Sequence, residues 1–342
     1  MISRLIRLAT ALGASLLIAP AGAQDKVLNL YSARHYQTDE ALYANFTRQT
    51  GIKINRIEGK EEELLERIRN EGANSPADVF ITVDASRLAQ ADGFGLFAPV
   101  KSAVLESRIP AHLRDPESHW FAFSTRARVI VYNKLKLKAA DVANYEDLAR
   151  PALKGKVCSR SGAHPYNISL GAALIQHIGE AKTEEWARGV VANFARSPKG
   201  GDTDQIKAVA AGECDVAVSN TYYLVRLLRS TKREDQALME KVGVVWPNQS
   251  SFGTHINVSG GGMLKTAPNK DAAVKFLEYL ASDEAQAYFA DGNNEWPVVP
   301  SVQVSNAELK SLGSFKADTL NVGELAKTTA QAQKVCDRAG YR

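Results

Sequence analysis

Strand-like and helix-like segments alternate along most of the chain, and this alternation restricts the possible folds more than any other feature of the sequence. In the first third, strand-like runs occupy 27–32, 52–58 and 77–83, and helix-like runs occupy 38–51, 60–72 and 85–93. Thr38 stands where the first helix should start, and Gly51 stands just past its end. This order of segments predicts a mostly parallel sheet with helices on both faces.

A second series of the same kind begins at residue 155. Its strand-like runs lie at 155–161 and 214–220, and its helix-like runs lie at 167–179, 184–195 and 203–213. A chain of this length exceeds what one hydrophobic core usually organises, so two domains are expected. The two series therefore predict two α/β lobes.

Two further segments are suited to connect these lobes. Residues 120–134 (WFAFSTRARVIVYNK) form one long strand-like run whose middle could cross from lobe to lobe. Residues 242–264 contain two apolar strands separated by a polar centre, which indicates a return crossing. Residues 269–291 then predict one long helix. The expected architecture is thus two lobes joined by a two-strand hinge.

The N-terminus has the features of a secretory signal peptide. Arg4 and Arg7 precede an apolar run at 8–19, and Ala21-Gly22-Ala23 offers small residues at which a signal peptidase could cut. The apolar run is too short to span a bilayer comfortably, and no later stretch approaches the roughly 18 to 20 apolar residues of a spanning helix. We therefore expect residues 1–23 to be removed and the mature chain to be exported.

The charge of the mature chain argues against a nucleic-acid partner. Removal of residues 1–23 takes away two of 42 basic residues and none of the 38 acidic ones, which leaves a formal net charge of +2. Nucleic-acid-binding domains usually carry a strong basic excess. Motifs for a nucleophilic serine, a zinc protease, a phosphate-binding loop or a Cys-x-x-Cys pair are also absent from the sequence.

Three cysteines occur in this exported chain, so one intramolecular disulfide and one leftover thiol are possible. Cys158 ends one strand-like run and Cys214 opens another, and the two could meet across neighbouring strands. We predict a Cys158–Cys214 bond with Cys336 left over. The alternative is three unpaired, buried thiols.

The pair Tyr222-Tyr223 directly follows the strand-like run at 214–220, where a helix should begin. Adjacent side chains on a helix normally diverge, but at a helix entry with Ser219 or Asn220 as cap they can converge. The first turn of a helix offers unpaired N–H groups and the positive end of the helix dipole, which stabilise anions. A tyrosine becomes an anion only by losing a proton of pKa about 10, and a strongly charged metal ion would remove it.

Other tyrosines occupy similar positions. Tyr36, with His35 beside it, and Tyr166 each lie between a strand-like and a helix-like run, at the sheet edge where open α/β folds bind ligands. Phenolates with an imidazole form a hard, oxygen-rich site that suits Fe³⁺ better than Zn²⁺ or Mg²⁺. Four phenolates around Fe³⁺ leave one net negative charge, which Arg126 and Arg226 could compensate.

Each of these residues also has a purely structural interpretation. A single tyrosine near a strand end is more often a core aromatic with a hydrogen-bonded hydroxyl. Arg126 could simply bridge the two lobes, and Arg226 could belong to a solvated helix face. The metal hypothesis depends on the set of residues rather than on any one of them.

Four segments resemble the periplasmic ferric-ion-binding proteins, also called bacterial transferrins: 29–39 (NLYSARHYQTD), 161–169 (SGAHPYNIS), 212–223 (GECDVAVSNTYY) and 253–260 (GTHINVSG). The likeness extends over nearly the whole mature chain. It implies a type II periplasmic binding protein fold that closes on Fe³⁺ as a transported ligand. It also implies a monomer that is not an enzyme and that delivers iron to an inner-membrane ABC permease and its ATPase.

By the same resemblance, residues 24–123 plus about 250–302 form the first lobe, and residues 124–249 plus about 303–342 form the second. The implied metal ligands are His35, Tyr36, Tyr166, Tyr222 and Tyr223. Better-known members place a glutamate ligand where Val83 stands here, which favours a tyrosine-rich subgroup.

Two alternatives stay open. A protein of the same fold could bind an organic cation or oxyanion in an aromatic box, or the chain could be an exported iron-dependent enzyme.

Overall fold

The computed structural model of this 342-residue chain describes residues 26–34 and 36–342. The signal peptide expected at 1–23 and the predicted ligand His35 therefore lie outside the described residues. Within the described part of the chain, no helix is both long enough and apolar enough to cross a membrane.

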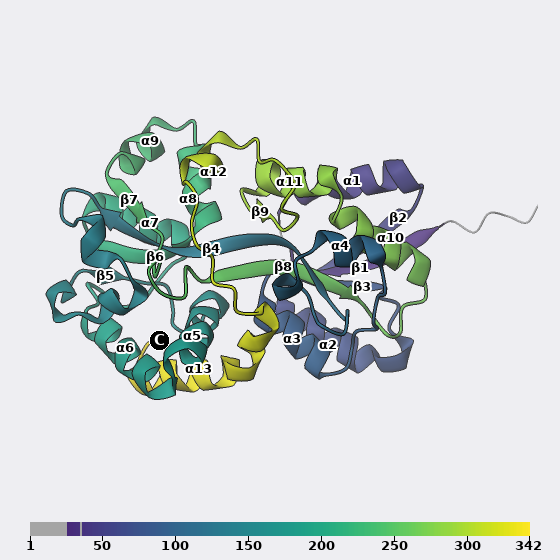
Figure 1. The fold of residues 1–342 in the computed structure, drawn as a ribbon, viewed down its shortest axis with the longest axis horizontal. Helices are drawn as coiled ribbons and strands as arrows, with labels where there is room; N and C mark the ends of the chain where they lie inside the picture. The colour runs from purple at the N-terminus through teal and green to yellow at the C-terminus, as the bar shows by residue number, and fades with distance from the viewer. Residues whose placement is uncertain (1–25, 35) are drawn as a thin grey trace, which may run out of the picture.

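One sheet runs through the whole molecule, with the strand order β2-β1-β3-β8-β4-β6-β5 (Figure 1). The described strands are β1 (Val27–Ser32), β2 (Lys53–Glu58), β3 (Val79–Thr82), β4 (Phe121–Asn133), β5 (Val157–Cys158), β6 (Val216–Asn220), β7 (Val242–Val245), β8 (Ile256–Met263) and β9 (Trp296–Pro297). β1 pairs in parallel with β2 and β3, and β5 pairs in parallel with β6. The parallel strands β1, β2 and β3 belong to the first predicted series of strands and helices, and the parallel strands β5 and β6 belong to the second.

β4 connects the two halves of the sheet. Between Phe121 and Ala127 it pairs antiparallel with β8, and from Arg128 onward it pairs antiparallel with β6. β8 returns through the centre and also pairs with β3. Figure 1 shows these two strands crossing the middle of the molecule between two groups of helices. The structure thus has the two crossing strands that the sequence indicated.

The helices cover both faces of each half of the sheet (Figure 1). Beside the first half lie α1 (Asp39–Thr50), α2 (Glu61–Glu71), α3 (Ala85–Gly93), α4 (Ala103–Arg108), α10 (Lys270–Leu280) and α11 (Asp283–Asn293). Beside the second half lie α5 (Pro165–Ile178), α6 (Glu180–Ala192), α7 (Asp202–Ala211), α8 (Thr221–Leu228), α9 (Arg233–Met239), α12 (Ala307–Ser311) and α13 (Leu325–Ala339).

The start and stop signals of α1 are those that the sequence suggested. Thr38 is its N-cap, and Gly51 follows its end in the left-handed conformation (φ 70°), which glycine adopts without steric cost. The prediction of one helix over 269–291 is wrong, because the chain forms α10 and α11 with a break between them. Ser282 is extended there, and its hydroxyl accepts a hydrogen bond from the Ala285 N–H at 3.3 Å, which starts a new helix.

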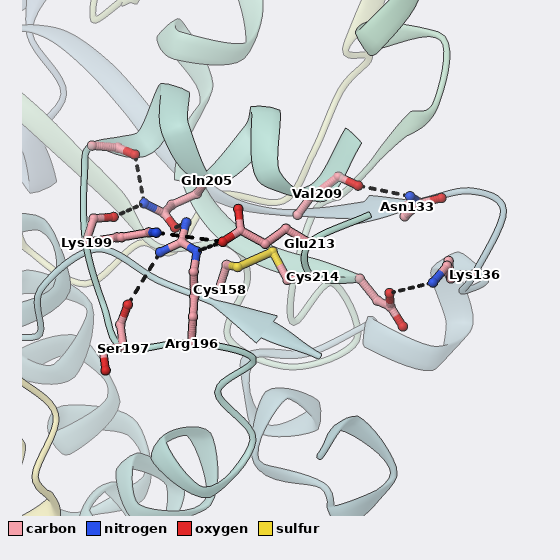
Figure 2. Close-up of a disulfide and its surroundings, with 12 residues drawn as sticks. Asn133, Lys136, Cys158, Arg196, Ser197, Lys199, Gln205, Val209, Glu213 and Cys214 are labelled. Atoms are coloured by element: carbon pink, nitrogen blue, oxygen red, sulfur yellow. Dashed lines mark hydrogen bonds and ion pairs between the residues drawn. A yellow bond between two sulfur atoms is a disulfide. The ribbon is translucent and has the colours of Figure 1, made fainter. Parts of the chain in front are cut away.

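Cys158 and Cys214 form the expected disulfide, which joins the end of β5 to the residue two places before β6. Figure 2 shows it beside Arg196 and Glu213, whose side chains pair at 2.7 Å. Cys336, on α13, is buried and unbridged.

Candidate metal-binding cleft

Three of the predicted tyrosines meet where α5 and α8 begin. The hydroxyl oxygens of Tyr166 and Tyr222 are 3.0 Å apart, and the rings of Tyr222 and Tyr223 lie with their centroids 4.2 Å apart. Tyr166 is in the first turn of α5, where the N-cap His164 accepts a hydrogen bond from the Tyr166 N–H. Asn220 is the N-cap of α8. The adjacent tyrosines therefore do converge at a helix entry.

Tyr36 reaches this group from the other half of the molecule. It follows β1, and its ring stands edge-on to the ring of Tyr222 with centroids 6.3 Å apart. The segment that carries it is held by Arg34, whose guanidinium donates to both carboxylate oxygens of Asp39 at 2.6 and 3.0 Å. The structure thus brings together Tyr36, Tyr166, Tyr222 and Tyr223 from three segments that are distant in sequence.

Arg126 lies buried in β4, close to this tyrosine cluster, and 1 % of its surface is exposed. It donates hydrogen bonds to the Ser259 hydroxyl at 3.2 Å and to the Val83 carbonyl. Its positive charge favours the ionised form of Tyr36, Tyr166 and Tyr222. The buried position of Arg126 beside the phenols fits the predicted charge-compensating role.

Burial nevertheless dominates the titration of the phenols. Loss of solvent, followed by the repulsion of neighbouring ionised groups, raises the pKa of Tyr36, Tyr166 and Tyr222 above the ordinary value of 10. Without a bound cation, all three hydroxyls are therefore protonated at neutral pH. A cation that binds them has to displace these protons, which only a strong Lewis acid does at neutral pH.

Arg226 occupies a different place from Arg126. It is exposed, and its guanidinium carbon lies 5.5 Å from the centroid of the Tyr223 ring. Arg226 and Tyr223 border a cavity of about 680 Å³ that is also lined by Tyr36, Tyr222 and Arg229. Arg226 therefore stands at the open side of the tyrosine cluster.

A second cavity, of about 630 Å³, opens on the side of Tyr166 and His164. Val83, which by the resemblance stands where other members carry a glutamate, lines this cavity with a small exposed fraction and offers only an aliphatic side chain. Glu61 also lines this cavity and accepts a hydrogen bond from the Val83 N–H at 2.9 Å. Burial, and then the charge of Asp84, raise the pKa of Glu61 to about 7.

Glu295, which no sequence motif indicated, is fully buried close to the cluster. Its carboxylate accepts a hydrogen bond from the Ser124 hydroxyl at 2.7 Å and lies 3.5 Å from Arg34 and 4.0 Å from Arg126. This acidic residue follows α11, far from both arginines in sequence, and no local pattern distinguishes it from a surface glutamate.

Comparison with known proteins identifies the family of this chain. Residues 41–317 match the family of bacterial extracellular solute-binding proteins. "Iron uptake protein A1" of Synechocystis is 51 % identical over 325 residues, which cover 95 % of this chain and 90 % of that protein. The "Fe(3+)-binding periplasmic protein" of Serratia marcescens is 30 % identical over 309 residues, which cover 90 % and 89 % of the two chains.

Two solved structures similar to this chain are also those of iron-binding proteins. The Trichodesmium protein IdiA (FutA), described in complex with iron and citrate, superposes with a TM-score of 0.88 at 55 % identity, covering 92 % of this chain and 100 % of that one. The ferric-binding protein of Campylobacter jejuni superposes with a TM-score of 0.87 at 44 % identity, with the same coverage. The architecture is the type II periplasmic binding protein fold, and the chain belongs to the family of bacterial extracellular solute-binding proteins.

Proposed function

We propose that this protein is a periplasmic binding protein that captures Fe³⁺ in the tyrosine-lined cleft and delivers it to an inner-membrane ABC importer. The observation that carries the proposal is the convergence of buried phenols, with 3.0 Å between the hydroxyl oxygens of Tyr166 and Tyr222 and the Tyr36 ring against Tyr222. Four phenolate oxygens around one point form a hard anionic site, and such a site prefers Fe³⁺ among biological metals.

The proposed ligands are the phenolate oxygens of Tyr36, Tyr166, Tyr222 and Tyr223 together with the imidazole of His35, which directly precedes Tyr36. Arg126 compensates the negative charge of the loaded site from inside the protein. Arg226 compensates this charge from the open side of the tyrosine cluster. The aliphatic Val83 and the fourth tyrosine together support a cage made of tyrosines and one histidine rather than one that contains a carboxylate ligand.

Capture involves both halves of the molecule. Tyr36 belongs to the proposed first lobe, and the other three tyrosines belong to the proposed second lobe, with the boundaries given above. An ion that binds both sets of ligands favours the closed arrangement, since only that arrangement completes the cage. A cage with five protein ligands also leaves little room for the open coordination position that metal catalysis needs, which favours transport over an enzymatic role.

The proposed function also includes export to the periplasm and delivery of iron to a membrane transporter. Residues 1–23 act as a signal peptide, the mature protein works as a monomer in the periplasm, and a permease with its ATPase receives the iron. The family of extracellular solute-binding proteins supports export, and the names of the similar proteins, which refer to iron uptake and to periplasmic Fe(3+) binding, support iron as the transported ligand.

A visible spectrum tests the binding site directly. Phenolate bound to Fe³⁺ produces a ligand-to-metal charge-transfer band, so the purified mature protein should turn orange to red when one equivalent of a ferric chelate is added. The colour should bleach on acidification, because protons compete with the metal for the phenolate oxygens. Stoichiometric iron without such a band, or no iron binding at all, would contradict the proposed cage.

A further inference from the structure

A buried ion pair lies behind the tyrosines of the second half, and the proposed iron chemistry does not include it. Arg128 of β4 and Asp202, the first residue of α7, pair at 2.5 Å between Nη1 and Oδ2. Their side chains are 2 % and 0 % exposed. Because burying two charges costs solvation energy that the pairing only partly returns, such a pair is weak evidence of stabilisation and calls for another explanation.

The pair connects the two helices that carry the tyrosines. Arg128 donates to the Asn167 side-chain oxygen at 2.8 Å, and Asn167 is the neighbour of Tyr166 at the start of α5. Arg128 also donates to the Asn220 side-chain oxygen at 3.1 Å. The Asn220 N–H in turn donates to Asp202 at 2.7 Å. One buried ion pair therefore contacts the starts of both α5 and α8.

Asn220 shows that this connection takes precedence over local helix capping. Asparagine at an N-cap usually accepts a hydrogen bond from the first turn of its own helix. The Asn220 side chain makes no such bond to α8, and its oxygen accepts from Arg128 instead. The start of α8, two residues before Tyr222, is thus tied to β4 and α7.

The other oxygen of Asp202 is occupied as well. It accepts a hydrogen bond from Arg160 at 3.0 Å, and the Arg160 guanidinium carbon lies 5.0 Å from the centroid of the Tyr166 ring. The guanidinium carbon of Arg128 lies 5.9 Å from the same centroid. Asp202 therefore orients two arginines that flank Tyr166, in addition to its bond to Asn220.

We propose that Arg128 and Asp202 are positioning residues for metal capture, which hold the starts of α5 and α8 in fixed register so that the Tyr166 and Tyr222 oxygens stand together before the metal arrives. This inference rests on the proposed function. Partners that orient metal ligands without touching the metal typically change its affinity about 10- to 100-fold when they are replaced. Directional hydrogen bonds from a planar guanidinium are well suited to this task.

The test compares three variants of the mature protein. Asp202→Asn keeps the size of the side chain and removes its charge. Asn220→Ala removes the bond to Arg128 and leaves the ion pair in place. Asp78→Asn is the matched control, because Asp78 is also fully buried and accepts backbone N–H bonds at 2.6 and 2.7 Å, but lies directly before β3 in the other half.

Two quantities are measured for each variant: the Fe³⁺ affinity, by competition with a chelator, and the position and intensity of the charge-transfer band. We expect Asp202→Asn to weaken binding about 10- to 100-fold and to shift or weaken the band, because the phenolate oxygens no longer converge. Asn220→Ala should change both quantities in the same direction by a smaller factor. Asp78→Asn should lower the melting temperature only.

Wild-type affinity and an unchanged band in both Asp202→Asn and Asn220→Ala would overturn the inference. An equal loss of iron binding in Asp78→Asn would overturn it as well. If Asp202→Asn does not fold, Asn220→Ala decides alone, and unchanged binding there counts against the inference. A wild-type protein without any band refutes the proposed function and this inference together, whereas a wild-type band with unaffected variants refutes the positioning role alone.

Discussion

The ring of Tyr36 stands edge-on to the ring of Tyr222, with centroids 6.3 Å apart, and this contact joins the two halves of the cleft. Tyr36 follows β1 and Tyr222 follows β6, and these strands lie on opposite sides of the crossing strands β8 and β4 in the sheet. Removal of one or the other should therefore disturb different steps of iron capture.

Tyr222→Phe or Tyr223→Phe should lower Fe³⁺ affinity by more than about 100-fold, beyond the effect typical of an outer partner of a metal ligand. The ligands that remain cannot supply enough negative charge. Tyr36→Phe should instead retain iron on the second half while the cleft stays open. Small-angle scattering of each variant with and without iron separates these cases, since only a closing protein contracts. A Tyr36→Phe variant that contracts fully, with unchanged affinity, would show that Tyr36 is not a ligand.

The two arginines near the cluster should differ in importance. Arg126→Gln removes a buried charge beside three phenols, so we expect iron affinity to fall about tenfold or more and the unfolding free energy to fall by about 3 to 5 kcal/mol. Arg226→Gln removes an exposed charge that solvent and salt already screen, so its effect should be several-fold smaller and should diminish in high salt. Chelator competition at two salt concentrations measures the iron affinity of both variants. A larger loss of iron affinity in Arg226→Gln than in Arg126→Gln would show that Arg226 is the more important of the two arginines.

Glu61 should make the stability of the iron-free protein depend on pH. Its pKa is about 7 in the folded protein and 4.5 in the unfolded chain, so the folded state holds a proton that the unfolded state releases between these values. Stability is then lost as pH rises from about 4.5 to 7. Glu61→Gln, which mimics the protonated form, should be more stable than wild type by roughly 1 to 3 kcal/mol at pH 7 and equal to it at pH 4.

Urea unfolding at the two pH values measures this difference. Glu62→Gln, an exposed neighbour on the same helical turn, is the control, and it should show no such pH dependence. Equal stability of wild type and Glu61→Gln at both pH values would mean that Glu61 is ionised in the folded protein.

The Cys158–Cys214 bond should stabilise the protein without contributing to the metal site. The bond spans a sequence separation of 56 residues, and its loss in a Cys158→Ser, Cys214→Ser double variant should cost about 2 to 4 kcal/mol. The charge-transfer band of the loaded variant should match that of wild type. Peptide mapping of the wild-type protein under non-reducing conditions should find Cys336 unbridged, and a bond from Cys336 to either partner would contradict the structure.

Much of the fold could be predicted because its signals are local. The strands of both series, the limits of α1 at Thr38 and Gly51, and the crossing run of β4 follow from hydrophobic spacing and end residues that lie within a few positions of each other. The break between α10 and α11 was missed because Ser282 interrupts a pattern whose apolar spacing continues on both sides.

The tyrosines of the cleft could also be recognised from sequence, since each stands at a junction between a strand and a helix, and such junctions gather at one edge of a parallel sheet. The distances between these tyrosines could not be predicted from the sequence. Whether Tyr166 approaches Tyr222 depends on how the tertiary structure places the starts of α5 and α8, and this placement joins positions that are 56 residues apart.

By itself, therefore, the sequence determined the order of the secondary-structure elements and the residue types placed at their ends. Tertiary structure alone decided which buried charges contact one another: Glu295 lies between Arg34 and Arg126, and Asp202 lies between Arg128 and Arg160. The physical reason is that a charged side chain is buried only where a partner from another segment compensates it, and no local sequence pattern specifies that partner.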